Sequence, residues 1–158
     1  MIENYLQILE ESLRKKQEVL LRIEECNANQ EQILKADSVS EEEFAQSIEK
    51  KGELIEALTK LDDGFETLYA QIKEQLSAGK EQYKEQIRVL QKLIVEVTEK
   101  SVAIQVQESR NKALAEKFFA EKKSEVKQGR RNSKAAMNYY RNMKQSQVIP
   151  PQFLDKKK

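Results

Sequence analysis

The sequence contains no histidine and no tryptophan, and its 158 residues include one cysteine, two prolines and four glycines. Histidine is the commonest general acid or base and the commonest metal ligand in proteins, so its absence argues against an enzyme. The adjacent Asp62 and Asp63 are not a catalytic pair, because neighbours on a helix point about 100° apart. We therefore expect no enzymatic activity, no cofactor and no bound metal.

The sequence also has little cysteine and no long hydrophobic run. Cys26 has no second cysteine with which to form a disulfide or a zinc site, which favours a reducing compartment. The first five residues carry an acidic side chain where a signal peptide carries basic ones, and no apolar run approaches the ~20 residues that span a bilayer. These features predict a cytoplasmic protein without membrane insertion.

The residues that are abundant favour long helices. Charged residues make up 35% of the chain and hydrophobic ones 39%, a composition typical of amphipathic helices, and no alternating pattern predicts a strand. We expect an all-α fold, an antiparallel bundle or coiled coil of two to three long helices, followed by a short, mobile C-terminal helix.

Apolar spacing and capping signals predict where the helices begin and end. Leucines and isoleucines between Leu6 and Leu34 fall on positions of a three-and-four spacing that share one helix face, which predicts a helix over residues 2–35. Ser40 and Glu43 form a capping box, and Val39 and Phe44 are spaced as a hydrophobic staple. They predict a second helix over 41–77, whose Gly52 and Gly64 are either surface glycines or mark a close approach of helices or a slight bend.

A third helix is predicted over residues 80–120, after Gly79, which we expect to end the second helix in a left-handed conformation. Residues 1–120 would then form the bundle. Residues 121–134 are polar and basic and would be a helix extension or a linker, and residues 135–158 would form an amphipathic segment with a basic tail. The apolar stripe of the second helix fits packing within the chain or against a second copy, so a homo-oligomer stays open.

Charge is divided unevenly along the chain. Residues 110–158 hold 14 Lys and Arg against 4 Asp and Glu, whereas residues 1–109 hold 14 against 23. Basic residues followed by Tyr139 and Tyr140 could contact nucleic acid through phosphates and stacked bases. The acidic first part would repel a polyanion, which makes nucleic-acid binding the weaker interpretation.

The C-terminal segment carries apolar residues that a polar stretch separates from the predicted bundle. Methionine and tyrosine are favoured at protein interfaces, so these residues would either dock on the bundle or bind a partner protein. The candidate partner-binding residues are Ala136, Met137, Tyr139, Tyr140, Met143, Val148, Ile149, Phe153 and Leu154.

Residues 43–58, followed by Leu61-Asp62-Asp63-Gly64-Phe65, resemble the second helix of the FlgN-type flagellar export chaperones. Residues 135–140 and 151–158 look like the C-terminal tail of the form found in Gram-positive bacteria. The order of three helices and the length of the chain are also similar.

The resemblance implies a cytoplasmic chaperone that binds hook–filament junction proteins of the FlgK and FlgL type and delivers them to the type III export gate. It implies that cargo binds the C-terminal helical region, which corresponds here to Ala136, Met137, Tyr140 and Met143. Tyr139 or Tyr140 would dock to the gate component FlhA. The alternatives are a FliT-type chaperone of the filament cap protein, a structural coiled-coil adaptor and a nucleic-acid-binding protein.

Overall fold

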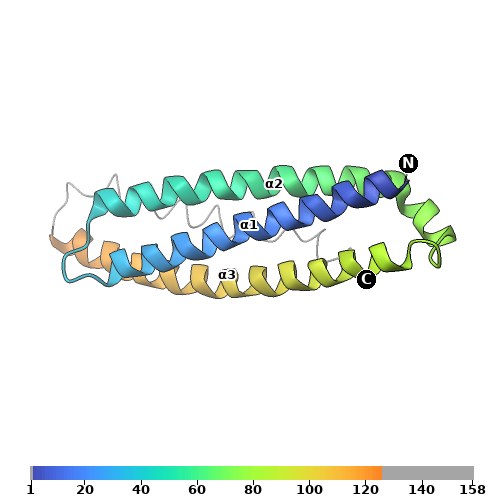
Figure 1. Ribbon diagram of the computed structural model, residues 1–158. Coiled ribbons are helices and arrows are strands. Elements are labelled where there is room, and N and C mark those ends of the chain that lie inside the picture. The colour runs from blue at the N-terminus through green and yellow to red at the C-terminus, as the bar shows by residue number, and fades with distance from the viewer. Residues whose placement is uncertain (1, 126–158) are drawn as a thin grey trace.

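The computed structural model describes residues 2–125, with side chains as far as Lys122, as three long helices. Helix α1 spans Ile2–Lys35, α2 spans Glu41–Ala78 and α3 spans Lys84–Glu125. They run antiparallel to one another in chain order (Figure 1). The predicted all-α bundle is confirmed, whereas the expected C-terminal helix lies outside the described residues.

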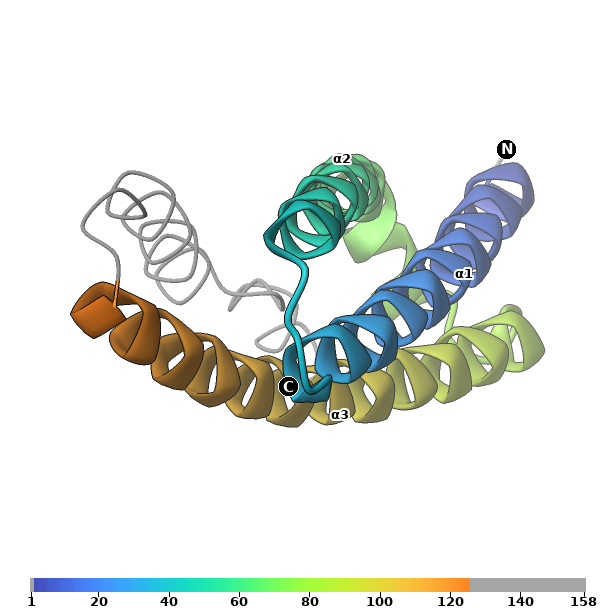
Figure 2. The ribbon, with the colours of Figure 1, turned by 90° about the vertical axis from the view of Figure 1, so that its left-hand side faces the viewer.

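Helix α1 is the common support of the bundle. Both α2 and α3 pack along its length, while the backbones of α2 and α3 approach each other at few positions. Figure 2 shows α2 and α3 on different sides of α1.

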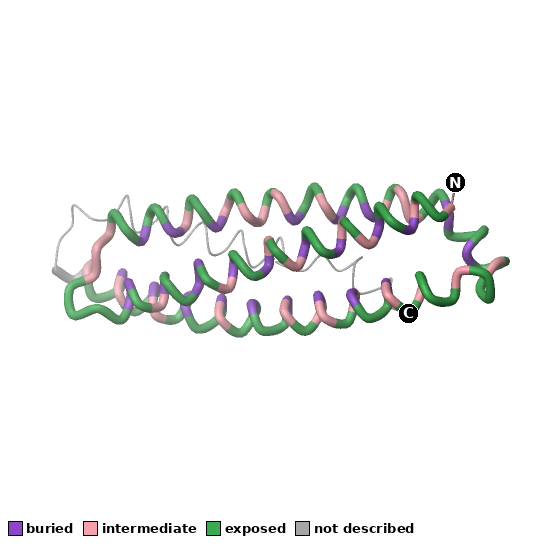
Figure 3. Tube along the Cα trace, in the orientation of Figure 1, coloured by how far each residue is buried: buried purple, intermediate pink, exposed green. Residues whose placement is uncertain are grey.

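The core consists of the helix faces that meet around α1, coloured as buried in Figure 3. Buried side chains in α1 recur at steps of three and four residues, the spacing that keeps them on one face. The larger apolar cluster includes Leu13, Leu20, Leu58 and Val97. The smaller one lies toward the α1–α2 connection and consists of Ile33, Leu34, Phe44, Ala115 and Phe119.

The start of α2 agrees with its capping signal. The Ser40 side chain accepts a hydrogen bond from the Glu43 backbone N–H at 3.2 Å, which satisfies one of the unpaired donors of the first turn. Val39 packs against the smaller cluster, to which Phe44 also belongs. The two residues predicted to form a staple therefore share one apolar cluster at the entry to the helix.

The connection between α2 and α3 differs from the prediction in two respects. Gly79 has a φ of −111°, so the expected left-handed cap is wrong. A Cβ at Gly79 would lie 3.1 Å from the ring of Tyr83, so a side chain there would crowd that ring. Residues 79–83 form turns, with the Tyr83 N–H bonded to the Gly79 carbonyl, and α3 begins at Lys84 rather than at residue 80.

The exposed Gly64 inside α2 is a surface glycine. A Cβ built there meets no atom within 4 Å, so the residue does not mark a close approach between helices. Of the two interpretations of this glycine, the structure favours the surface one.

Candidate functional site

The residues predicted from the sequence to bind cargo or the export gate lie outside the described residues: Ala136, Met137, Tyr139, Tyr140, Met143, Val148, Ile149, Phe153 and Leu154. Their roles remain predictions. The described part of the chain contains three further features that bear on function: a buried polar layer, a pocket beside Cys26 and a groove between α2 and α3.

A buried lysine joins all three helices. The Lys51 side chain in α2 is fully buried, and its Nζ donates hydrogen bonds to Asn27 Oδ1 at 2.9 Å and Gln30 Oε1 at 2.8 Å, both in α1. The same ammonium contacts Glu108 Oε2 of α3 at 3.0 Å. This ion pair is screened from solvent and meets the requirement that a buried charge be paired.

Amide and hydroxyl groups complete this layer. Asn111 Nδ2 donates to the Asn27 carbonyl at 2.9 Å and to Gln30 Oε1 at 3.2 Å, and Gln30 Nε2 donates to Ser47 Oγ at 2.9 Å. Glu108 Oε1 is buried and has no hydrogen-bond partner within residues 2–125. We call Asn27, Gln30, Ser47, Lys51, Glu108 and Asn111 the polar layer.

A second buried ion pair connects α1 and α2. Lys16 and Asp62 are both buried, and the Lys16 ammonium bonds to Asp62 Oδ1. Burial lowers the pKa of Lys16 and of Lys51, because removal from water disfavours the charged amine, and Asp62 and Glu108 oppose this change. Asp63, in contrast, is exposed, so the two adjacent aspartates do not share a site.

The polar layer was missed by reasoning from apolar spacing, although the sequence contains a signal for it. Asn27 and Gln30 continue the three-and-four spacing of Leu20 and Ile23 in α1. Lys51 does the same between Phe44 and Leu58 in α2. Polar residues at core positions of a heptad pattern predict buried contacts that fix the register of the helices.

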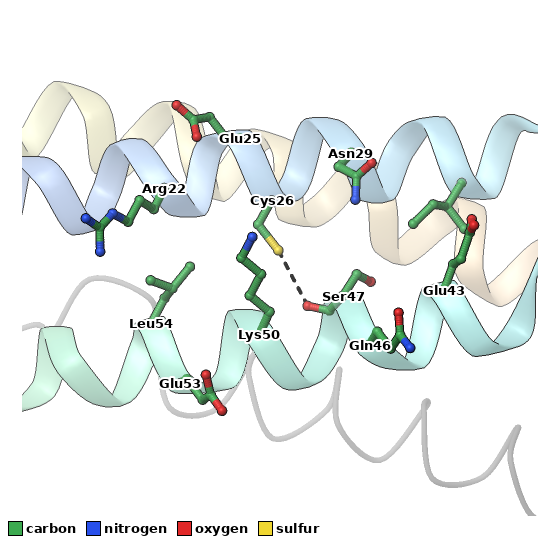
Figure 4. A pocket seen from close by; sticks show the side chains of 11 residues that line it. Arg22, Glu25, Cys26, Asn29, Glu43, Gln46, Ser47, Lys50, Glu53 and Leu54 are labelled. Atoms are coloured by element: carbon green, nitrogen blue, oxygen red, sulfur yellow. Dashed lines mark hydrogen bonds between the residues drawn. The ribbon is translucent and has the colours of Figure 1, made fainter.

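A pocket of about 810 Å³ lies between α1 and α2 and contains the single cysteine (Figure 4). The Cys26 thiol contacts the Ser47 carbonyl at 3.5 Å. Burial raises the pKa of Cys26, opposed by the positive charges of Lys51 and Lys50, so the less nucleophilic thiol form is favoured. Charges of both signs surround the pocket, including Arg22, Glu25 and Lys50, and they select no class of ligand.

A groove of about 680 Å³ lies between α2 and α3, next to the turn that connects them. Its apolar lining includes Leu76, Ile87, Leu90 and Val95. Its charged lining residues are Lys73, Lys80, Glu81, Lys84 and Arg88. We call it the α2–α3 groove. Apolar residues and mainly basic residues line the same surface there.

An exposed apolar strip continues from this groove along α3. Val95, Val102 and Val106 are 45%, 50% and 54% exposed and are spaced by seven and four residues, so they share one helix face. Gln91, Thr98, Ser109 and Ala113 fall on the same face and carry no charge, whereas the exposed Glu99 lies on this face between Val95 and Val102. We call the three valines the valine strip.

The described residues lack two other kinds of functional feature, a metal site and a membrane-spanning helix. Within residues 2–125 no group of three acidic or cysteine side chains is arranged to hold a metal ion. No helix in this part of the chain has the length and apolar character needed to cross a membrane.

No family model, curated protein or solved structure matches this chain. The resemblance to FlgN-type chaperones therefore rests on the sequence stretches quoted above. The fold and the surfaces described here rest on the structure.

Proposed function

We propose that this chain is a cytoplasmic flagellar secretion chaperone of the FlgN type, which binds hook–filament junction proteins and delivers them to the type III export gate. The observation that carries the proposal is the group of apolar residues between Ala136 and Leu154, which follows a polar, basic stretch and resembles the tail of that family. An amphipathic segment of this kind can cover the apolar face of a cargo helix before the cargo assembles.

The packing of α2 favours this function over a coiled-coil adaptor. An adaptor that dimerises through the α2 stripe needs Phe44, Leu58 and Ile72 at a surface, but all three are buried within the described chain. The stripe is used to hold α2 against its own neighbours. A partner must therefore bind through other residues, such as those of the C-terminal segment.

Charge favours a protein partner over nucleic acid. Residues 2–125 contain 19 Lys and Arg against 26 Asp and Glu, which gives the described bundle a net negative charge. Phosphate backbones bind surfaces on which basic residues predominate. The bundle as a whole would repel DNA or RNA, even though the C-terminal segment is basic.

The proposal is tested by measuring the affinity of the purified full chain for purified junction proteins of the FlgK and FlgL type. We expect Tyr140→Ala combined with Met143→Ala to weaken binding by at least about 10-fold, since each removes contact area of a kind that dominates interfaces. Leu21→Ala, at an exposed position of α1, is the matched control and should change nothing.

Each outcome of this experiment has a different meaning. Circular dichroism should show unchanged helicity in both variants. Unchanged affinity in the Tyr140 and Met143 variant would refute the assignment of the cargo-binding residues. Absence of binding to either junction protein by the full chain would refute the function itself, and selective binding of the filament cap protein would identify a FliT-type chaperone instead.

A further inference from the structure

The α2–α3 groove is basic in a bundle that is acidic overall. Four basic residues and one acidic residue, Glu81, line it, whereas acidic residues outnumber basic ones in residues 2–125 as a whole. Arg88 is paired with Glu85 at 3.6 Å, but both side chains are well exposed, and such pairs contribute little. The positive charge at this end of the bundle therefore remains available to an acidic partner.

The apolar surface of the groove extends well beyond the basic residues. Val95 lines the groove and is also the first residue of the valine strip, which reaches Val106. Eleven residues of helix correspond to about 17 Å along the axis, or three turns. Groove and strip together form a mainly apolar track along α3, with the exposed Glu99 between Val95 and Val102 and with positive charge at its α2–α3 end, a shape suited to a single helix.

The charge of the groove argues against the most obvious occupant, the rest of this chain. Residues 126–158 contain nine Lys and Arg and a single acidic residue, Asp155. Like charges placed beside Lys80, Lys84 and Arg88 would repel each other. A segment of opposite charge would gain attraction at the same positions.

We propose that the α2–α3 groove binds an amphipathic helix of a partner protein, with apolar side chains against the valine strip and acidic side chains beside Lys80, Lys84 and Arg88. The apolar contacts supply affinity, and the charged contacts fix the direction of the bound helix, because exposed ion pairs contribute more to orientation than to strength. This goes beyond the proposed function, since it places a partner on the bundle rather than on residues 136–154.

The test uses the full chain and three labelled peptides in fluorescence anisotropy titrations. The first is an 18-residue helical peptide with a leucine face flanked by glutamates, and the second replaces every glutamate with lysine. The third is residues 130–158 of this chain. We expect the acidic peptide to bind at least about 10-fold more tightly than either basic peptide, with an affinity that falls as salt is added.

Substitutions then locate the bound peptide. Lys80→Glu combined with Lys84→Glu should weaken binding of the acidic peptide by about 10-fold or more and strengthen binding of its lysine counterpart. Val102→Asp should weaken both peptides. The matched controls are Lys15→Glu, an exposed lysine of α1, and Leu21→Asp, which is as exposed as Val102 but also lies on α1.

Several results would overturn the proposal. The proposal fails if the acidic peptide does not bind, or if it binds no more tightly than its lysine counterpart. It also fails if the control variants lose as much affinity for the peptide as the groove variants do. Tightest binding by the peptide of residues 130–158 would assign the groove to the chain's own C-terminal segment. Dimerisation of the full chain in sedimentation equilibrium that Val102→Asp abolishes would assign it to a second copy. These titrations contain no junction protein. Their outcomes therefore do not depend on whether the chain binds that cargo.

Discussion

At the scale of single residues, the core-facing sides of the helices are not purely apolar, because some of their positions hold charged side chains. Lys16 and Lys51 occupy positions at which the spacing predicts leucine, and each is buried with a carboxylate partner from another helix. Burying an ion pair costs desolvation energy that the attraction between the charges only partly offsets. These residues therefore contribute more to the pairing of specific helices than to stability.

Gly64 is the residue whose replacement has the simplest expected effect. Alanine should raise the free energy of unfolding by about 0.5–1 kcal/mol, because glycine loses more backbone entropy in a helix and the new methyl group meets no neighbour. Urea denaturation measures the change. Gly79→Ala is the contrasting variant, because its methyl group would crowd the ring of Tyr83, and it should gain less. A Gly64→Ala protein no more stable than the parent would contradict this account.

At the scale of the helices, caps and turns set the boundaries. The side chain of Ser40 and the apolar pair Val39 and Phe44 act together at the start of α2. At its other end the Gly79 N–H bonds to the Gln75 carbonyl at 3.0 Å, so the helical bonding pattern continues into the turn. The first boundary is defined by side chains, and the second by backbone hydrogen bonds that Gly79 makes to Gln75 and Tyr83.

Ser40→Ala tests the first boundary. Loss of the side-chain acceptor for the Glu43 N–H should lower the free energy of unfolding by about 1 kcal/mol, with the helical content of the folded protein nearly unchanged. Ser38→Ala, two residues earlier in the exposed connection, is the control and should have no measurable effect. Equal stability of the two variants in thermal or urea denaturation would show that the cap contributes nothing.

The same boundaries show what the sequence could predict. Local signals were enough for α1, which spans the predicted residues 2–35, and for the start of α2 at Glu41. The start of α3 was placed four residues early, because residues 79–83 form turns, with the Tyr83 N–H bonded to the Gly79 carbonyl, before the helix begins. The α2–α3 groove was missed for a similar reason, since the residues of α2 and α3 that line it come together only after the chain reverses.

At the scale of the whole molecule, the polar layer divides the apolar core of residues 2–125 into a larger and a smaller cluster. Hydrogen bonds in this layer connect all three helices. Lys51 contributes from α2, Asn27 and Gln30 from α1, and Glu108 from α3. A helix shifted by one heptad would place one of these groups opposite an apolar side chain without a partner. The layer therefore favours one alignment of the helices over its alternatives.

Removing one charge of this layer should be more harmful than removing both. Lys51→Met leaves Glu108 buried without its cation and should lower the free energy of unfolding by about 3 kcal/mol. Lys51→Met combined with Glu108→Leu removes the unpaired charge and should recover most of that loss, so the double-mutant cycle should show strong coupling. Lys100→Met, which removes a half-exposed pair with Glu24, is the control and should cost less than about 1 kcal/mol. If the losses from the two single substitutions at Lys51 and Glu108 simply add in the double variant, the pair does not act as a unit. The alignment of the three helices would then have to come from apolar packing alone.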